Sequence, residues 1–261
     1  MWMDINVKQL FTHPIKGLTP QAETLVNLQA GHGIRGDRAF ALMYNTAVPD
    51  DRIVVPWMKK KNFAMQCDLP ALAALDCNYN FQTDVLRVKH KDIELLATQT
   101  HTPQGRDQIS AFFTGYLAAV APLHSALRLV GDRNGTSRYP DRIAVHLSLV
   151  SQATLDQLSD IAGQYVDVRR FRPNIVLEGV PAWAEFGWVG QQLQLGSATL
   201  EVTAPINRCL NINVNPDSGE SDLQLLALLK QHFNHTQTGV VAKVISSGTV
   251  QIGDRLQVLT S

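Results

Sequence analysis

The chain has 261 residues, of which 45% are hydrophobic and 18% charged, the proportions of a soluble globular protein with one or two domains. Lys+Arg and Asp+Glu both number 23, and this balance argues against a nucleic-acid-binding protein, which would carry a basic excess. Three cysteines without a CxxC pair argue against a disulfide scaffold, a zinc ribbon or a self-contained iron–sulfur cluster. Without a signal-like or membrane-spanning apolar run, we expect a reducing, cytoplasmic location and no membrane partner.

Short strands separated by turns are predicted along the first hundred residues. The segment 5–17, INVKQLFTHPIKG, alternates apolar and polar residues before a proline and a glycine, so it predicts a strand ending in a turn. Further strands are predicted at 21–29 and 38–44, and the loop AGHGIRGDR between them has three glycines that let the backbone pass close to a neighbour. A hairpin is predicted at 85–97.

Three helices are predicted. Apolar residues at helical spacing indicate a helix over 106–121. Ser151 is expected to cap a second helix, ATLDQLSDIAG, that Gly163 closes. Ser221 and Gln224 resemble a capping box and are expected to open a third helix, DLQLLALLKQHF.

The second half of the chain is rich in strand patterns as well. Strands or hairpins are predicted at 127–131, 143–150, 174–179, 192–205 and 239–259. The segment 132–142, DRNGTSRYPDR, is polar and rich in turn residues and predicts a surface loop.

Strands outnumber helices, and most are short with turn signals nearby. This pattern predicts a mixed, β-rich α+β fold with β-barrel architecture rather than a doubly wound sheet. A seam near 120–125, in VAPLHSA, divides the chain into expected domains at 1–122 and 123–261.

Cys209 in the stretch INRCLNINVNPDSGES is the first candidate for chemistry. A neighbouring cation, Arg208, would favour the thiolate, and thiolates serve as nucleophiles or as ligands for soft metals. Polar neighbours make Cys209 unlike an ordinary core cysteine, although a buried structural cysteine is the alternative. A cysteine protease would need a histidine base, for which His13 and His146 are the strand-borne candidates.

Basic residues gather at three strand ends or glycine turns, in HPIKG, GIRGDR and RRFRPN. They are Lys16, Arg35, Arg38, Arg169, Arg170 and Arg172. Arginine forks match phosphate oxygens and lysine adds a point charge, so the clusters indicate an anion site, with scattered surface charge as the alternative. His232 and His235 form an HxxH pair that a solvated helix end explains better than a metal. No nucleotide-binding fingerprint is present.

Taken in order, HPIKG, GIRGDRAFALM, RRFRPNIVL, INRCLNINVNPDSGE and GTVQIGDRLQVL resemble the MOSC family over about residues 5–259. The resemblance is strongest to members with an N-terminal MOSC β-barrel domain. That group includes the mitochondrial amidoxime-reducing component and bacterial molybdenum-dependent reductases of N-hydroxylated compounds. It implies a MOSC N-terminal β-barrel domain at 1–122 followed by a MOSC domain at 123–261.

The resemblance implies the molybdenum cofactor, a molybdopterin dithiolene that holds molybdenum with one cysteine of the protein as a further ligand. By position in the motif that ligand, and the catalytic residue, is Cys209. The implied cofactor-binding residues are Lys16, Arg38, Arg172, Asn174, Asn207 and Arg208. The chain departs from the family pattern where serine is frequent, at Gly17 and Asn207, and at Asn215 of the turn NPDSG.

The implied activity is the two-electron reduction of an N–O bond in a small N-hydroxylated substrate. Some bacterial relatives carry a ferredoxin-like domain with four cysteines, which this sequence lacks, so a separate flavin reductase, ferredoxin or cytochrome is the expected electron donor. The alternative is a cofactor carrier or a sulfur-transfer module, because MOSC domains also form part of molybdenum cofactor sulfurases.

Overall fold

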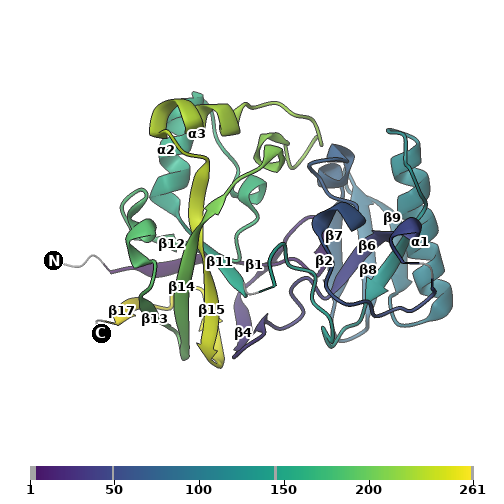
Figure 1. The fold of residues 1–261 in the computed structure, drawn as a ribbon, viewed down its shortest axis with the longest axis horizontal. Coiled ribbons are helices and arrows are strands. Elements are labelled where there is room, and N and C mark those ends of the chain that lie inside the picture. Colours follow the sequence, from purple (N-terminus) through teal and green to yellow (C-terminus); the bar gives the residue numbers. More distant parts are fainter. Residues whose placement is uncertain (1–3, 49, 144–145, 260–261) are drawn as a thin grey trace.

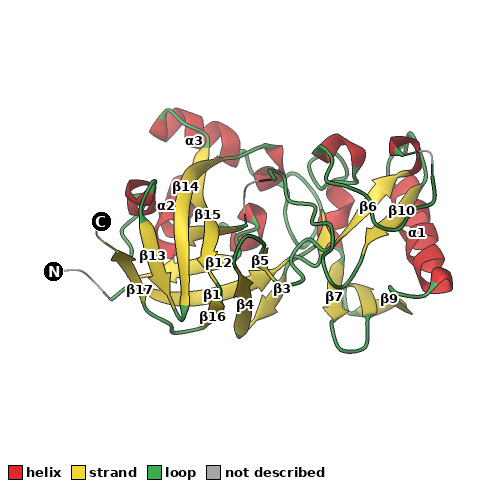
Figure 2. Cartoon of the chain, turned by 60° about the horizontal axis from the view of Figure 1, so that its bottom comes forward, coloured by secondary structure: helices red, strands yellow, loops and turns green. Residues whose placement is uncertain are grey.

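A computed structural model describes residues 4–48, 50–143 and 146–259. Its ribbon shows two lobes side by side, and both chain ends lie on the lobe with the long strands (Figure 1). Strands dominate both lobes, and the described residues contain three α-helices (Figure 2). The expected β-rich α+β class is therefore confirmed.

The larger lobe is built on a curled eight-stranded sheet, in which the parallel pairing is that of β11 with β12. Its strand order is β17 (Leu256–Leu259), β13 (Gln192–Leu195), β14 (Ala198–Asn207), β15 (Gln237–Ser246), β11 (Leu147–Ser151), β12 (Ile175–Glu178), β1 (Asn6–Thr12) and β3 (Gln21–Glu23). Strand β14 shows why this sheet forms, because its buried and partly exposed residues alternate from Ala198 to Val202. A three-stranded sheet packs onto the same core, with order β16 (Gly248–Gln251), β4 (Leu25–Gln29) and β5 (Gly33–Ile34).

Two helices cover the larger lobe on one side, α2 (Gln152–Ala162) and α3 (Leu225–Phe233) (Figure 1). Their apolar faces meet around Leu155, Leu158, Leu225 and Leu229 in one buried cluster. Three short 3-10 helices also belong to this half of the chain, η4 (Val168–Phe171), η5 (Ala184–Trp188) and η6 (Leu210–Asn213).

The smaller lobe holds two three-stranded sheets and the first helix. Their strands are β10 (Leu127–Gly131), β6 (Phe40–Tyr44) and β2 (Ile15–Lys16) in one sheet, and β7 (Asp76–Asn80), β8 (Val85–His90) and β9 (Ile93–Gln99) in the other. Helix α1 (Pro103–Ala118) buries Ile109, Phe113 and Leu117 against them. The 3-10 helices η1 (Asn45–Ala47), η2 (Lys60–Asn62) and η3 (Pro70–Ala74) lie between the strands of this lobe in sequence.

The helix starts differ from the sequence expectation. Helix α1 begins at Pro103 rather than 106, because the Thr102 hydroxyl accepts a hydrogen bond from Gly105 N at 3.1 Å. The capping box is wrong: α3 begins at Leu225, and Ser221 forms a β-bridge with Val214.

Helix α2 begins directly after Ser151 and ends at Gly163, as expected. The Ser151 hydroxyl does not cap it, however, and instead donates to the Val180 carbonyl at 2.8 Å. Of the strand predicted at 143–150, the structure has β11 from Leu147, and residues 144–145 lie outside the described residues. The other predicted strands and hairpins are present within a few residues of the expected bounds.

Strand pairing crosses the predicted boundary at 122/123 in both directions. Strand β1 from the beginning of the chain pairs with β12, and β10 from the second half pairs with β6. Each lobe therefore contains strands from both halves of the chain. The division into domains at 1–122 and 123–261 stays a prediction.

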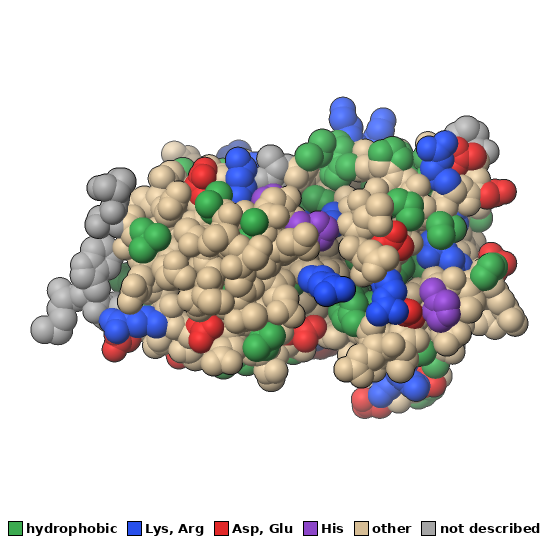
Figure 3. Space-filling view, turned by 90° about the horizontal axis from the view of Figure 1, so that it is seen from below, with side chains coloured by type: hydrophobic (Ala, Val, Ile, Leu, Met, Phe, Trp, Pro, Cys, Tyr) green, Lys and Arg blue, Asp and Glu red, His purple; other side chains and the backbone are tan. Residues whose placement is uncertain are grey.

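Acidic and basic side chains lie interspersed on the face seen in Figure 3, in keeping with the balanced charge of the sequence. Among the described residues, the helices are too short or too polar to cross a bilayer.

Candidate functional site

A cavity of about 200 Å³ collects side chains from both halves of the chain. Loops at strand ends supply most of its walls, which is why residues far apart in sequence meet there. The seven residues that the family resemblance implies as metal ligand or cofactor-binding residues all line this cavity: Lys16, Arg38, Arg172, Asn174, Asn207, Arg208 and Cys209.

Cys209 lies two residues after the end of β14 and caps the N-terminal end of η6, and it is exposed on the cavity. The neighbouring Cys67 side chain is the largest cause that lowers the pKa of Cys209, to about 6, against the opposing effect of partial burial. A backbone hydrogen bond at Asn211 and the positive charge of Lys60 lower it further. The site therefore favours a thiolate at neutral pH.

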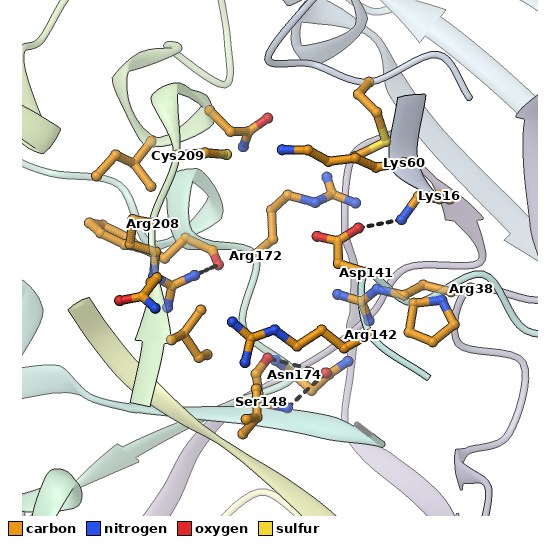
Figure 4. A pocket seen from close by; sticks show the side chains of 18 of the residues that line it. Lys16, Arg38, Lys60, Asp141, Arg142, Ser148, Arg172, Asn174, Arg208 and Cys209 are labelled. Carbon is orange, nitrogen blue, oxygen red and sulfur yellow. Dashed lines mark hydrogen bonds and ion pairs between the residues drawn. The ribbon is translucent and has the colours of Figure 1, made fainter. Parts of the chain in front are cut away.

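Cys67 and Lys60 come from the segment between β6 and β7, and the sequence reasoning missed both as site residues. Lys60 extends across the cavity toward Cys209 (Figure 4). The thiol of Cys67 stays protonated, because Cys209, partial burial and Asp68, to which the thiol donates at 3.3 Å, all raise its pKa. The run Lys59-Lys60-Lys61 was a visible basic signal, whereas nothing in the sequence near Cys67 connects it with Cys209.

Arg208 lies beside Cys209 and interacts with its charge, but its hydrogen bonds go to backbone carbonyls. Its guanidinium donates to the Phe171 carbonyl at 2.8 Å and to the Thr238 carbonyl, and lies 5.4 Å from the centre of the Phe171 ring. Burial lowers the pKa of Arg208 to about 10, opposed by the charge of Cys209. The nearby cation that counts among the main causes for Cys209 is Lys60.

A buried carboxylate, Asp37, holds three cavity residues in place. It accepts from Arg38, from Arg138 at 3.2 Å and from the Asn174 amide at 3.1 Å. Burial alone would raise the pKa of Asp37, but the charge of Arg38 and the neighbouring imidazole of His13 outweigh burial and hold it well below its usual range.

Asn174 is fixed a second time by β11. Its side-chain oxygen accepts from Ser148 N at 3.1 Å, and its own backbone N–H donates to the Ser148 hydroxyl at 3.1 Å. The parallel pairing of β11 with β12 explains this contact, because it brings the start of both strands to the same edge.

Lys16 is buried, and its ammonium group contacts the exposed carboxylate of Asp141 (Figure 4). Burial lowers the pKa of Lys16, and the ion pair opposes that shift. The guanidinium of Arg172 lies near Asp141 and donates to the Leu18 carbonyl, while burial and repulsion by Arg38 lower the pKa of Arg172 to about 10. Asp141 and its neighbour Arg142 belong to the segment predicted as a surface loop; both are exposed, and both also line the cavity.

The remaining basic residues from the sequence divide between cavity and surface. Arg170 lines the cavity and pairs with Asp222 at 2.7 Å, whereas Arg35 is exposed elsewhere. Arg169 pairs with Asp167 and Asp217 and does not line the cavity.

The histidines proposed as alternatives occupy different surroundings. His146 lines the cavity, with its Nδ1 accepting from Val244 N at 2.8 Å, and His13 is fully buried beside Asp37. His235 packs against Phe233. Within the described ranges, no three His, Cys, Asp or Glu side chains are grouped to hold a metal, so the HxxH pair lacks further side-chain ligands.

The charges of the cavity suit an anion beside a soft metal. Among its described lining residues are eight Lys or Arg side chains and one carboxylate, that of Asp141. The Nε atom of Arg208 is buried without a hydrogen-bond partner in the described part of the chain, so an acceptor there would satisfy it. An exposed low-pKa thiolate on such a wall is the donor type that thiophilic metals prefer.

Comparisons with known proteins point to one family. The family model of the MOSC domain matches residues 139–257. The mitochondrial amidoxime reducing component 2 of Bos taurus is 33% identical over 91 residues, which cover 35% of this chain and 26% of that protein. The mitochondrial amidoxime-reducing component 1 of Xenopus laevis is 30% identical over 124 residues, 40% of this chain and 35% of that protein. The matched segments thus span about a quarter to a third of these relatives.

Two further similarities extend the comparison. The molybdenum cofactor sulfurase of Oryza sativa subsp. japonica is 40% identical over 55 residues, which cover 21% of this chain and 6% of that protein. The crystal structure of the YuaD protein from Bacillus subtilis covers 99% of this chain and 98% of its own, with 13% identity and a TM-score of 0.48.

Proposed function

The chain contains a MOSC domain at residues 139–257, and we propose that it binds the molybdenum cofactor and acts as an oxidoreductase on small N-hydroxylated compounds. The observation that carries the proposal is the exposed thiolate of Cys209 on a cavity lined mainly by cations. Relatives named for amidoxime reduction and for molybdenum cofactor sulfuration support the same chemistry.

The residues of the cavity fit the group in charge and in donor type. Cys209 would hold molybdenum through its sulfur, and Lys16, Arg38 and Arg172 would hold the terminal phosphate. The pterin would lie against Asn174, Asn207 and Arg208. When bound, the cofactor supplies the two-electron redox chemistry.

The protein's own residues orient the group and manage charge. Asp37 fixes Arg38 and Asn174 from behind, so that their side chains meet a ligand without rearrangement. Asp141 pairs with the ammonium group of Lys16 in this structure. A bound phosphate would replace Asp141 as the partner of that ammonium group. The Cys67 thiol holds its proton beside Cys209, and Lys60 faces the same space with a positive charge that suits an anionic or strongly polar substrate.

Electrons come, on this proposal, from a separate donor such as a flavin reductase, a ferredoxin or a cytochrome. An artificial donor replaces that partner in the test. Protein made in a cofactor-competent host should reduce an amidoxime or a hydroxylaminopurine with reduced viologen, and protein from a cofactor-deficient host should not.

The second candidate function is that of a cofactor carrier, which the match to the sulfurase favours. A carrier should bind and release the cofactor without turning over a substrate.

Metal and pterin content test the role of Cys209 directly. We expect Cys209→Ser made in the competent host to lose most of its molybdenum while its circular dichroism stays that of the wild type. Cys77→Ser is the matched control, because Cys77 is buried away from the cavity, and it should keep its molybdenum. Equal molybdenum content in Cys209→Ser and the wild type would remove Cys209 from the proposed site.

A further inference from the structure

We propose that Cys67 and Cys209 form a reversible disulfide when the cofactor-free protein meets a peroxide, so that the cavity carries a thiol-based redox modification site. This inference does not depend on the proposed function, because it concerns two side chains of the chain itself. It is carried by their meeting in one cavity from segments 142 positions apart.

The first argument is proximity. Cys67 and Cys209 line the same cavity, and each is the largest single influence on the pKa of the other, so the two side chains lie close together. Cys67 lies in the turn at 66–68 and Cys209 in the short loop between β14 and η6, outside helices and strands. The sulfurs must approach to about 2 Å for a bond, and loops rather than regular elements would supply that movement.

The second argument is access. Cys209 is exposed and Cys67 is partly exposed, and both line the cavity that a small oxidant would enter. Cys77, the third cysteine, is 6% exposed and packed in the apolar core of the smaller lobe. Its neighbours there include Leu75 and Tyr79, so an oxidant reaches it poorly.

The chemistry needs one peroxide for each disulfide. The Cys209 sulfur attacks hydrogen peroxide, the O–O bond breaks, and the sulfur becomes a sulfenic acid as one oxygen leaves as water. The Cys67 sulfur then attacks the oxidised sulfur, the S–O bond breaks, and the second oxygen leaves as water with the remaining thiol proton. Two thiols lose two electrons in total, and a dithiol reductant returns them.

The bond would link the turn at 66–68 to the end of β14 across the cavity. It would occupy the sulfur proposed as the metal ligand, so oxidation and metal binding exclude each other at Cys209. Closing a long loop also restricts the unfolded chain, so the oxidised protein should melt at a higher temperature than the reduced protein.

The test uses cofactor-free full-length protein treated with hydrogen peroxide at a one-to-one ratio. We expect free thiols, titrated after denaturation, to fall from three to one, and non-reducing peptide mass spectrometry to find Cys67 joined to Cys209. Dithiothreitol should restore three thiols. The Cys77→Ser variant is the matched control and should fall from two thiols to none. In Cys67→Ser, dimedone should instead trap a sulfenic acid on Cys209.

An unchanged thiol count in the wild type, or a cross-link that involves Cys77 or a second molecule, overturns the inference. Repeating the experiment with protein from the cofactor-competent host separates the two proposals. Protection of both thiols in that protein is expected when Cys209 holds the metal. Equal disulfide formation in both preparations would support the redox site and would contradict the proposal that Cys209 is a metal ligand.

Discussion

At the scale of single residues, Gly17 explains one departure from the family pattern. Its φ is +83°, and a Cβ atom there would lie 2.4 Å from the Ala64 carbonyl oxygen. A serine at this cavity position would therefore require the backbone of 64–65 to move. The close approach of the chain at Gly17 to the backbone of Ala64 explains why this position has a glycine.

We expect Gly17→Ala to lower the free energy of unfolding by about 1–3 kcal/mol, measured by urea denaturation. Gly190→Ala is the matched control, because Gly190 has a similar φ of +85° with nothing within 4 Å of the added Cβ. The control isolates the cost of the left-handed conformation from the cost of the clash. A loss no larger than that of Gly190→Ala would contradict the clash with Ala64.

The pH dependence of Cys209 reports the influence of its neighbour Cys67. In cofactor-free, reduced protein, alkylation of Cys209 by iodoacetamide should follow a titration with a midpoint at about pH 6. Cys67→Ala removes the largest cause of the lowered pKa, so the midpoint should rise toward the value of about 8.5 for an ordinary thiol. Alkylation at pH 7 should then slow down.

Peptide-resolved mass spectrometry distinguishes Cys209 from the other cysteines in this experiment. Lys60→Met should give a smaller rise in the same midpoint, since the charge of Lys60 is a lesser cause. A midpoint that does not move in Cys67→Ala would show that the thiol pair is not what stabilises the thiolate.

At the scale of elements, one buried arginine fastens helix α1 to the smaller lobe. Arg106 donates to the carbonyls of Thr100 at 3.0 Å, Gly131 at 3.1 Å and Leu129 at 2.5 Å. These carbonyls lie after β9 and on β10, so the helix, the end of one strand and the edge of another share a single cation. Burial lowers the pKa of Arg106.

Arg106→Leu should destabilise the protein by about 3 kcal/mol or more, because it leaves buried carbonyls without donors. Urea unfolding followed by circular dichroism measures this loss. Arg87→Ala on neighbouring β8 is the control, since Arg87 forms an exposed pair with Glu94 that should contribute less than about 1 kcal/mol. Equal losses for both variants would argue against the bracing role of Arg106.

At the scale of the whole molecule, Asp37 joins distant parts of the chain behind the cavity. Besides Arg38 it contacts Arg138 and Asn174, and it accepts from the backbone N–H of His13 at 2.9 Å. A single buried carboxylate thus stabilises the fold and fixes the cavity wall together.

Asp37→Asn should lower stability at neutral pH by about 3 kcal/mol, because the partly buried Arg38 and Arg138 lose their counter-charge. The pKa of Asp37 is lowered in the folded protein, so its contribution is complete above the unfolded value of about 3.9 and is lost as pH falls below it. The stability difference between wild type and variant should therefore shrink from pH 5 downward. Urea midpoints between pH 3 and 7 measure it.

Asp50→Asn serves as the control for that experiment, because Asp50 pairs with Arg52 at the exposed surface and should contribute less than about 1 kcal/mol. A difference between wild type and Asp37→Asn that stays constant across this pH range would refute the assignment of the buried charge to Asp37.

The sequence by itself determined the class of the fold and most of the strands, and the family resemblance named seven residues that line the cavity. Alternating apolar and polar residues, as in β14, and glycine turns are local signals, so they can be recognised in the sequence without coordinates. The motif around Cys209 and the basic strand ends marked a soft ligand and an anion site for the same reason.

Only the tertiary structure decided which partners surround that sulfur. Cys67 and Lys60 approach Cys209 from the other half of the chain, and the guanidinium of Arg208 donates its hydrogen bonds to backbone carbonyls. Ser221 could not be assigned correctly either, because its bridge to Val214 competes with a helix cap. Such contacts depend on how loops meet after the sheets have packed, and long-range packing leaves no periodic signal in the chain.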